Sequence, residues 1–191
     1  MKLLVGLGNP GHAYEKARHN IGARVLKEFA AQEKIDLKKS DSLTAVWGKG
    51  ALFQEEIRLL LPQSYMNLSG PVVARCVQKW DVQPEEMFVV LDDLHLPLGN
   101  LRIRPSGSYG GQQGLRSVIE AIGTEQFPRL RIGIESETMN EPWQDFVLKP
   151  FTRKEETVIT KAVEAAVACC RLWIDQGIEA CMNRFNRKGL S

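Results

Sequence analysis

The 191-residue sequence contains no apolar run long enough to cross a bilayer, which excludes a membrane-spanning helix. Its four cysteines show no C-x-x-C spacing, so they form neither a zinc motif nor a dithiol redox motif of that kind. We expect all four to be buried, reduced thiols. No basic leader or small-residue cleavage site precedes the first apolar run, so we expect a cytoplasmic protein. The net charge of +2 is too small to indicate a partner.

The composition and the spacing of apolar residues indicate one α/β domain that covers residues 1–191. The hydrophobic fraction is 43% and the charged fraction is 25%, and both are ordinary for a globular chain. Strand-like runs occur at 2–7, 57–61, 87–91, 101–104 and 130–134, with a weaker pair on either side of a turn at 48–50. The first three runs are continuously apolar, as expected for inner strands that are covered on both faces.

Helical periodicity separates these strands. Apolar residues share one face of a helix at 21–30, 72–77, 115–122 and, in the longest pattern, 158–170. Ser69 is a candidate N-cap for the second helix, and Gly123 is placed to end the third. The alternation of strands and helices predicts an α/β fold in which helices pack on a twisted, mixed, mostly parallel sheet.

Polar residues follow the three inner strands. Asn9 comes after the first strand, Asn67 comes shortly after the second, and Asp92 comes directly after the third. Ligands of open parallel sheets bind outside the carboxyl ends of the strands, so these side chains would meet if the strands were neighbours. Each residue alone is more simply a turn or capping residue. The three together, with a histidine nearby in the sequence, favour a functional site.

His19, in the segment R-H-N-I-G at 18–22, is the candidate for the catalytic residue. An imidazole has an ordinary pKa of about 6.5, so it can accept a proton from water near neutral pH. A carboxylate on its other ring nitrogen would fix the tautomer, and Asp92 is the favoured partner, with Asp93 as the alternative. A histidine at a helix start is more often only a capping residue, but its arginine and asparagine neighbours keep the catalytic interpretation open.

Two other enzyme classes match short motifs. The segment G-L-G-N-P-G at 6–11 fits the G-x-G-x-x-G pattern of dinucleotide-binding proteins. Pro10 counts against this interpretation, and so does the late start of the apolar helix pattern, near Ile21. His19, Asp92 and Ser108 occur in one of the orders known for serine hydrolases. Ser108 has a poor nucleophile-elbow context, so a His–Asp pair that activates water is the better interpretation.

The glycine-rich segment 105–114 lies among arginines. Glycine lets a backbone approach a ligand closely, although a mobile connection is the simpler interpretation. Neighbouring guanidinium groups suit phosphate oxygens, so the arginines beside this segment favour a nucleic-acid substrate over a solvated charged face. The arginines concerned are Arg102, Arg104, Arg116, Arg129 and Arg131.

A series of motifs in this chain resembles bacterial peptidyl-tRNA hydrolases. They are G-L-G-N-P-G at 6–11, Tyr14, R-H-N-I-G at 18–22, Y-M-N-L-S-G at 65–70, D-D-L at 92–94, R-L-R-I-G at 129–133 and F-V-L at 146–148. The resemblance covers nearly the whole chain, in order and spacing. It implies a monomer that hydrolyses the ester joining a peptide, or an N-blocked amino acid, to tRNA and so recycles tRNA in translation. It implies no metal, no other cofactor and no obligate protein partner.

The resemblance also implies roles for the residues that match the family motifs. His19 would be the base that activates water, Asp92 would orient it, and Asn9 would hold the peptide carbonyl groups. Arg104 and Arg131 would clamp the 5′ phosphate of the tRNA. The residues that would line the site for the peptide, the 3′ end and the acceptor stem are Tyr14, Tyr65, Met66, Asn67 and Gln113.

Three departures from the family pattern bear on activity. Gln112 and Gln113 stand where the family usually has His-Asn, Ala17 replaces Ser or Thr, and His95 replaces Asp. Gln113 keeps an amide donor but is one methylene longer than asparagine. The alternative to an esterase is therefore a catalytically weak or inactive relative that keeps the tRNA- or RNA-binding surface.

Overall fold

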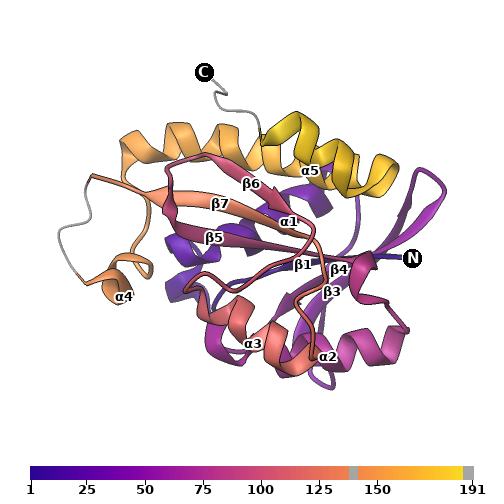
Figure 1. Ribbon diagram of the computed structural model, residues 1–191. Helices are drawn as coiled ribbons and strands as arrows, with labels where there is room; N and C mark the ends of the chain where they lie inside the picture. The colour runs from indigo at the N-terminus through magenta and orange to yellow at the C-terminus, as the bar shows by residue number, and fades with distance from the viewer. Residues whose placement is uncertain (138–141, 187–191) are drawn as a thin grey trace.

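A seven-stranded mixed sheet forms the middle layer of the protein (Figure 1). The computed structural model describes residues 1–137 and 142–186. Along the sheet the strand order is β2-β3-β4-β1-β5-β7-β6. The strands are β1 (Lys2–Gly6), β2 (Lys38–Ser40), β3 (Ala45–Leu52), β4 (Glu55–Pro62), β5 (Met87–Pro97), β6 (Leu101–Arg104) and β7 (Arg129–Glu135).

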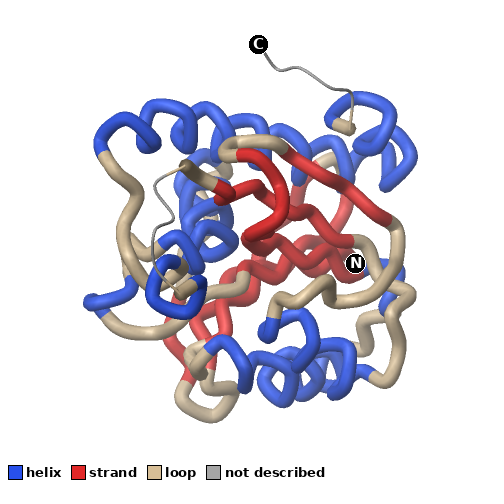
Figure 2. The backbone as a smooth tube through the Cα atoms, turned by 60° about the vertical axis from the view of Figure 1, so that its left-hand side comes forward, coloured by secondary structure: helices blue, strands red, loops and turns tan. Residues whose placement is uncertain are grey.

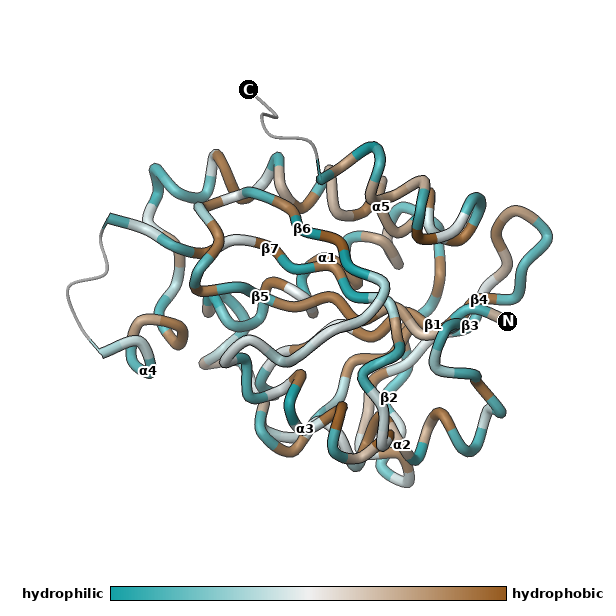
Figure 3. The backbone as a smooth tube through the Cα atoms, viewed as in Figure 1, coloured by the Kyte–Doolittle hydropathy of each residue, from teal (hydrophilic) through white to brown (hydrophobic). Residues whose placement is uncertain are grey.

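The four central strands run parallel in the order β4-β1-β5-β7, whereas β2, β3 and β6 pair antiparallel at the two edges. β1 and most of β5 are buried, as their continuous apolar runs predict, and Figure 3 shows the central strands as hydrophobic. The predicted α/β fold with a mixed, mostly parallel sheet is confirmed. Because β4, β1 and β5 are neighbours, the polar residues that follow them gather at one edge of the sheet.

Helices cover both faces of the sheet (Figure 2). α1 (Ile21–Gln32) and α5 (Arg153–Phe185) enclose one apolar core with the sheet, and α2 (Ser69–Trp80) and α3 (Gln113–Ile122) enclose the other. A short helix, α4 (Trp143–Phe146), lies beside the carboxyl edge. The single-turn helices are η1 (His12–Tyr14), η2 (Arg18–Asn20), η3 (Met66–Leu68) and η4 (Pro84–Glu86).

Two helix ends follow simple capping rules, and one predicted cap does not. Thr152 and Glu155 form a capping box at the start of α5, and Gly123 ends α3 with a φ of 80°. Ser69 was expected to be the N-cap of α2 but is its first residue, because the turn η3 continues directly into the helix. In the described part of the chain, no helix is long and apolar enough to span a membrane.

Two strand boundaries differ from the sequence-based expectation. The predicted turn at 48–50 is wrong, since these residues lie inside β3 and the hairpin turns at Phe53 and Gln54. Gly48 and Gly50 are needed for another reason: a Cβ at either position would lie 2.8 Å from the side chain of Ile35. β5 also continues past residue 91, because Asp92 and Asp93 still pair with β7.

Gly22 positions the start of α1 against the sheet. A Cβ at this position would lie 2.2 Å from the carbonyl oxygen of Val90 in β5 and 2.9 Å from the backbone nitrogen of Leu7. Only glycine permits this approach. Since η2 leads directly into α1, the close contact brings His19 to the carboxyl edge, beside β5.

Candidate active site

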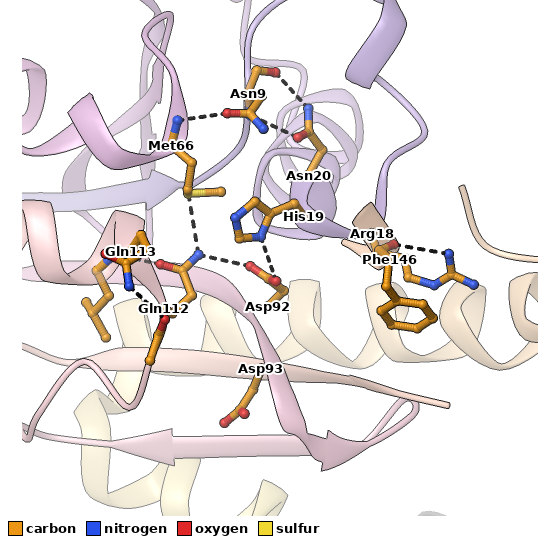
Figure 4. Close-up of polar contacts among 12 residues, drawn as sticks. Asn9, Arg18, His19, Asn20, Met66, Asp92, Asp93, Gln112, Gln113 and Phe146 are labelled. Carbon is orange, nitrogen blue, oxygen red and sulfur yellow. Dashed lines mark hydrogen bonds and ion pairs between the residues drawn. The ribbon is translucent and has the colours of Figure 1, made fainter. Parts of the chain in front are cut away.

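His19 and Asp92 form a buried pair at the carboxyl edge of the sheet (Figure 4). Nδ1 of His19 lies 2.7 Å from Oδ2 of Asp92, and the two residues are 9% and 2% exposed. An ionised carboxylate only accepts hydrogen bonds, so in the neutral imidazole Nδ1 carries the hydrogen and Nε2 keeps its lone pair. The structure thus brings these two residues together with the basic nitrogen turned away from the carboxylate.

The turn η2 is held in place from the opposite side of the site. The backbone nitrogen of His19 donates to the carbonyl of Val147 at 2.9 Å. The buried guanidinium of Arg18 donates to the carbonyl of Pro150 at 2.8 Å and to the carboxylate of Glu155 at 2.8 Å. The backbone that carries His19 is therefore fixed to the segment that leads from α4 into α5.

Asn9 and Asn20 hold the loop after β1 against the same turn. The backbone nitrogen of Asn9 donates to Oδ1 of Asn20 at 2.9 Å, and Nδ2 of Asn20 donates to the carbonyl of Asn9 at 2.8 Å. Oδ1 of Asn9 accepts a hydrogen bond from the backbone nitrogen of Met66 at 2.7 Å. This contact fixes the orientation of the Asn9 amide and leaves its Nδ2 as the group that can donate to a ligand.

Burial and the neighbouring carboxylate act in opposite directions on His19. Burial alone lowers the pKa of the imidazole, because it penalises the charged form. The charge of Asp92 and the hydrogen bond to it favour the imidazolium and leave the pKa of His19 raised above its ordinary value of 6.5. Asp92 therefore stabilises the charge that His19 would acquire by taking a proton from water.

The pleat of β5 sends Asp92 and Asp93 to opposite faces of the sheet. Asp92 faces His19, whereas Oδ2 of Asp93 lies 3.3 Å from Nη1 of Arg131 on β7. Oδ1 of Asp93 also accepts a hydrogen bond from the backbone nitrogen of His95 at 2.9 Å. Asp93 is therefore the ion-pair partner of Arg131 and does not contact His19.

A cavity of about 340 Å³ opens beside the His19–Asp92 pair. Its walls come from β5, β7, the glycine-rich loop and α4, and the aromatic rings of Tyr109 and Trp143 form part of its lining. Rings of this kind suit apolar side chains and the flat faces of bases. The lining residues are His19, Asp92, Asp93, Leu94, His95, Tyr109, Gly110, Gly111, Gln112, Gln113, Arg131, Trp143 and Val147. Asn9 and Asn20 line a second cavity, of about 290 Å³.

Gln112 is the buried member of the glutamine pair. Its Nε2 donates to Oδ1 of Asp92 at 3.0 Å, and its Oε1 accepts a hydrogen bond from the backbone nitrogen of Leu115 at 2.7 Å. The side chain of Gln113 instead turns back to the carbonyl of Gly111 at 3.3 Å, although Gln113 still lines the cavity. The resemblance to the family motifs indicated Gln113 as a site residue, but the residue that contacts Asp92 directly is Gln112.

The cysteines take no part in this site. All four are buried free thiols, as expected, and burial raises the pKa of the Cys76 thiol to about 11. A thiol with so high a pKa is a poor nucleophile. No group of three or more His, Cys, Asp or Glu side chains is arranged to hold a metal ion within residues 1–137 and 142–186.

Comparison with known proteins gives the family. The family model described as peptidyl-tRNA hydrolase matches residues 3–191. The chain belongs to the peptidyl-tRNA hydrolase family. Curated peptidyl-tRNA hydrolases from Desulforamulus reducens and Aquifex aeolicus are each 42% identical to it, over 98% and 100% of this chain and 90% and 98% of theirs. A peptidyl-tRNA hydrolase crystal structure from Acinetobacter baumannii matches with a TM-score of 0.91 and 32% identity, over 97% of this chain and 94% of that one.

The remaining residues expected from the peptidyl-tRNA hydrolase motifs lie in or next to η1, η3 and β6. Met66 is buried and contacts both Asn9 and Gln112, with its sulfur 3.4 Å from Nε2 of Gln112. Tyr14 is half-buried, and Tyr65, Asn67 and Arg104 are exposed. None of these five residues lines either described cavity.

Neither competing enzyme class fits the structure of this peptidyl-tRNA hydrolase family member. The glycine motif ends at Gly11 and is followed by the single turn η1, whereas the first α-helix, α1, begins ten residues later at Ile21, so the motif does not lead into the α-helix that would bind a pyrophosphate. Ser108 is exposed and does not line the cavity that holds His19. A serine nucleophile activated by His19 therefore has no support in this arrangement.

Arg129 supports the glycine-rich loop from inside the protein. It is 1% exposed, and its guanidinium donates to the carbonyls of Gly107, Glu125 and Phe127. Burial and the nearby charge of Arg131 lower the pKa of Arg129 to about 10. Within the group of arginines expected to face a nucleic acid, Arg129 thus has a structural role, and Arg102 and Arg104 remain exposed.

Sequence reasoning missed two walls of the site and one contact. Tyr109 lies in the glycine-rich loop and Trp143 begins the short helix α4, and neither segment shows a clear periodicity in its sequence, so only their position in space reveals their role. The sequence did contain a signal that the side chain of Gln112 turns inward. Gln112 directly precedes the helix pattern that begins near Leu115, and a side chain at the N-cap folds back onto the first turn.

Proposed function

We propose that this chain hydrolyses the ester bond between tRNA and a peptide or N-blocked amino acid, and so recycles tRNA in translation. The observation that carries the proposal is the buried His19–Asp92 pair, 2.7 Å apart, at the wall of an accessible cavity. This pair provides a general base without a protein nucleophile, which suits direct attack by water on an activated ester. Membership of the peptidyl-tRNA hydrolase family supports the substrate class.

In the proposed reaction, Nε2 of His19 takes a proton from water as the water oxygen attacks the ester carbonyl. Asp92 stabilises the resulting imidazolium through Nδ1. The tetrahedral intermediate then breaks down: the bond between the acyl carbon and the ribose oxygen breaks, and the ribose oxygen takes the proton from His19. The peptide is released as a carboxylic acid, which loses its proton to solvent. Nδ2 of Asn9 is a neutral donor for the peptide carbonyl or the developing oxyanion, and one such donor contributes about 3–4 kcal/mol.

The surrounding residues suit the two ends of the substrate. We propose that the 5′ phosphate of the acceptor stem is contacted by Arg104 and Arg131. The residues proposed to contact the peptide and the 3′ end are Tyr14, Tyr65, Met66, Asn67 and Gln113. Register supports the assignment to the 5′ phosphate, because Arg102 pairs with Arg131 and Arg104 pairs with Arg129, so all four lie on one face of the sheet. We also propose a monomer with no obligate protein partner, as the family motifs imply.

The direct test is release of a labelled amino acid from N-acetyl-aminoacyl-tRNA. We expect turnover of the N-blocked substrate and much slower release from the same tRNA with a free amino group. The alternative is a relative that binds tRNA without hydrolysis. It would show saturable tRNA binding with release at the rate of the buffer alone, and that result would reject the esterase.

The raised pKa of His19 sets the expected pH dependence. Only the neutral imidazole accepts a proton, so kcat/KM rises with pH and its midpoint lies above 6.5. Asp92→Asn removes the charge that raises this pKa and leaves burial, which lowers it, so the midpoint moves below 6.5. The same variant loses about a hundred- to ten-thousandfold in kcat because the amide supports the wrong tautomer. An unchanged midpoint in Asp92→Asn, measured from pH–rate profiles, would contradict the assignment of His19 as the base.

Arg104→Ala tests the contact with the 5′ phosphate. We expect KM for 5′-phosphorylated tRNA to rise severalfold and the salt slope of binding to fall by about one unit, because one phosphate contact is lost. Dephosphorylated substrate should show no such difference between Arg104→Ala and the unaltered protein. Lys161→Ala is the matched control, since Lys161 is exposed on α5, on the other side of the sheet. Equal effects on both substrates would argue against the clamp.

A further inference from the structure

Gln112 makes hydrogen bonds to two groups that belong to different parts of the site. It is 8% exposed and lies at the N-cap of α3. One end of its amide reaches Oδ1 of Asp92, at 3.0 Å, and the other reaches the backbone nitrogen of Leu115, at 2.7 Å (Figure 4). The side chain therefore connects the first turn of α3 with the carboxylate that faces His19.

The chemistry of these two partners allows only one orientation of the Gln112 amide. The backbone nitrogen of Leu115 can only donate, so it requires the amide oxygen, and the ionised carboxylate of Asp92 can only accept, so it requires the amide nitrogen. Rotating the amide by half a turn would place two donors together at one end and two acceptors together at the other. A buried group with both contacts unsatisfied is costly, so the orientation is fixed.

Asp92 is consequently held at both of its oxygens. Oδ2 faces His19 and Oδ1 faces Gln112. The terminal torsion of an aspartate side chain, about its Cβ–Cγ bond, is broad and roughly two-fold. A carboxylate with only one hydrogen bond can therefore rotate about Cβ–Cγ. Two donors on different elements, η2 and α3, remove this freedom. The imidazole is in turn aligned by the carboxylate.

We propose that Gln112 is a positioning residue that holds Asp92 in the orientation required by His19. The expected effect of Gln112 on the rate rests on the proposed function. The expected effect on the orientation of Asp92 and His19 does not. Gln112 reaches the reaction through these two residues. Its amide is neutral and does not titrate, so it donates to Asp92 at every pH at which the protein is folded.

Gln112→Glu separates positioning from packing. It keeps the shape of the side chain and an oxygen for Leu115, but the new carboxyl donates to Asp92 only while it is protonated. Two adjacent carboxyl groups raise the pKa of one of them, so the donor is lost as the pH rises. We expect kcat of this variant to fall by about ten- to a hundredfold on the alkaline side, where the unaltered protein reaches its plateau, with KM within about twofold.

The alkaline plateau distinguishes positioning from a purely electrostatic effect. A negative charge near His19 would raise its pKa and move the profile to higher pH, but it would leave the plateau unchanged. The other titratable groups that line the cavity are Asp93, His95, Tyr109 and Arg131, and they are the same in both proteins. A full plateau in Gln112→Glu would therefore overturn the proposal. Gln78→Glu is the control for the charge change, because Gln78 is exposed on the outer side of α2.

A second readout does not depend on activity. Nuclear magnetic resonance of the His19 ring should show a slowly exchanging Nδ1 proton in the unaltered protein. Gln112→Met, which has neither donor nor acceptor at the amide, should exchange this proton faster while the fold is retained. Gln112→His, whose imidazole can donate to Asp92, should restore slow exchange in part. If Gln112→Met leaves exchange unchanged, the proposal fails, whereas absence of turnover in the unaltered protein would reject only the proposed function.

Discussion

Replacing His19 with alanine should lower kcat for N-acetyl-aminoacyl-tRNA by about a hundred- to ten-thousandfold, the usual contribution of a general base. His19 lies against Asp92 through Nδ1, so its Nε2 is free of that contact and can accept a proton from water. The remaining rate would come from neutral donors such as Asn9 and from substrate binding. The measurement is single-turnover release at saturating enzyme, so that chemistry is separated from binding.

The dissociation constant for tRNA should stay close to its original value in His19→Ala, because binding depends on the basic surface. His12→Ala is the matched control. His12 lies seven residues earlier in the sequence and is exposed, and its contact is with Glu15 in the same turn. A His19→Ala protein that is folded and releases the amino acid at the original rate would remove His19 from the mechanism. A similar loss in both variants would indicate a general effect on this loop.

The largest effect on stability should come from Arg18→Met. Arg18 is 3% exposed, its guanidinium lies 2.8 Å from Glu155, and it stacks over the ring of Phe146 at 4.1 Å. Methionine fills part of the space but leaves the Glu155 carboxylate buried without its cation. Breaking a buried pair in this way costs about 3–5 kcal/mol in the free energy of unfolding. Denaturant unfolding at neutral pH measures it directly.

An exposed ion pair that also ends on α5 serves as the control for Arg18→Met. Arg24 on α1 and Glu156 on α5 form an ion pair at 2.9 Å, but both side chains are more than a third exposed. Arg24→Met should cost less than about 1 kcal/mol, because solvent screens that pair. Adding Glu155→Gln to Arg18→Met should recover part of the lost stability. Equal losses in Arg18→Met and Arg24→Met would show that burial does not determine the value of the pair.

The pH dependence of this effect follows from Glu155. Burial raises its pKa, but hydrogen bonds from Ser136 and Thr152 and the charge of Arg18 outweigh burial and leave the pKa below the ordinary value of 4.5. A carboxyl whose pKa is lowered on folding contributes stability above its unfolded pKa and loses it as the pH falls through its folded pKa. The difference between Arg18→Met and the unaltered protein should therefore shrink in acid.

Much of the site could be predicted because its residues lie close to regular elements. The apolar runs of β1, β4 and β5 identified three buried parallel strands, and the rule that ligands bind at their carboxyl ends grouped Asn9 with Asp92. His19 could be added because it directly precedes a helix with one apolar face. Gly22 had no such signal, since its close approach to Val90 depends on how α1 packs.

The tertiary structure decided between neighbouring residues of the same type, for which the sequence offered only a preference. Asp92 and Asp93 are both acidic and adjacent, and only the register of β5 against β7 determines that Asp92 faces His19 while Asp93 faces Arg131. Gln112 and Gln113 are identical residues, and the start of α3 determines which one turns inward. In both cases, neighbouring residues point in different directions, so a choice between them requires the packed element.

The sequence by itself determined the α/β fold, the buried strands and the candidate pair of His19 with Asp92. These follow from local patterns: apolar runs, helical periodicity and polar residues after strands. Only the tertiary structure decided that the base is aligned by contacts from η2, β5 and α3 together. The reason is that such contacts join residues far apart in the chain, from His19 to Asp92 to Gln112, and a local pattern carries no information about distances across the fold.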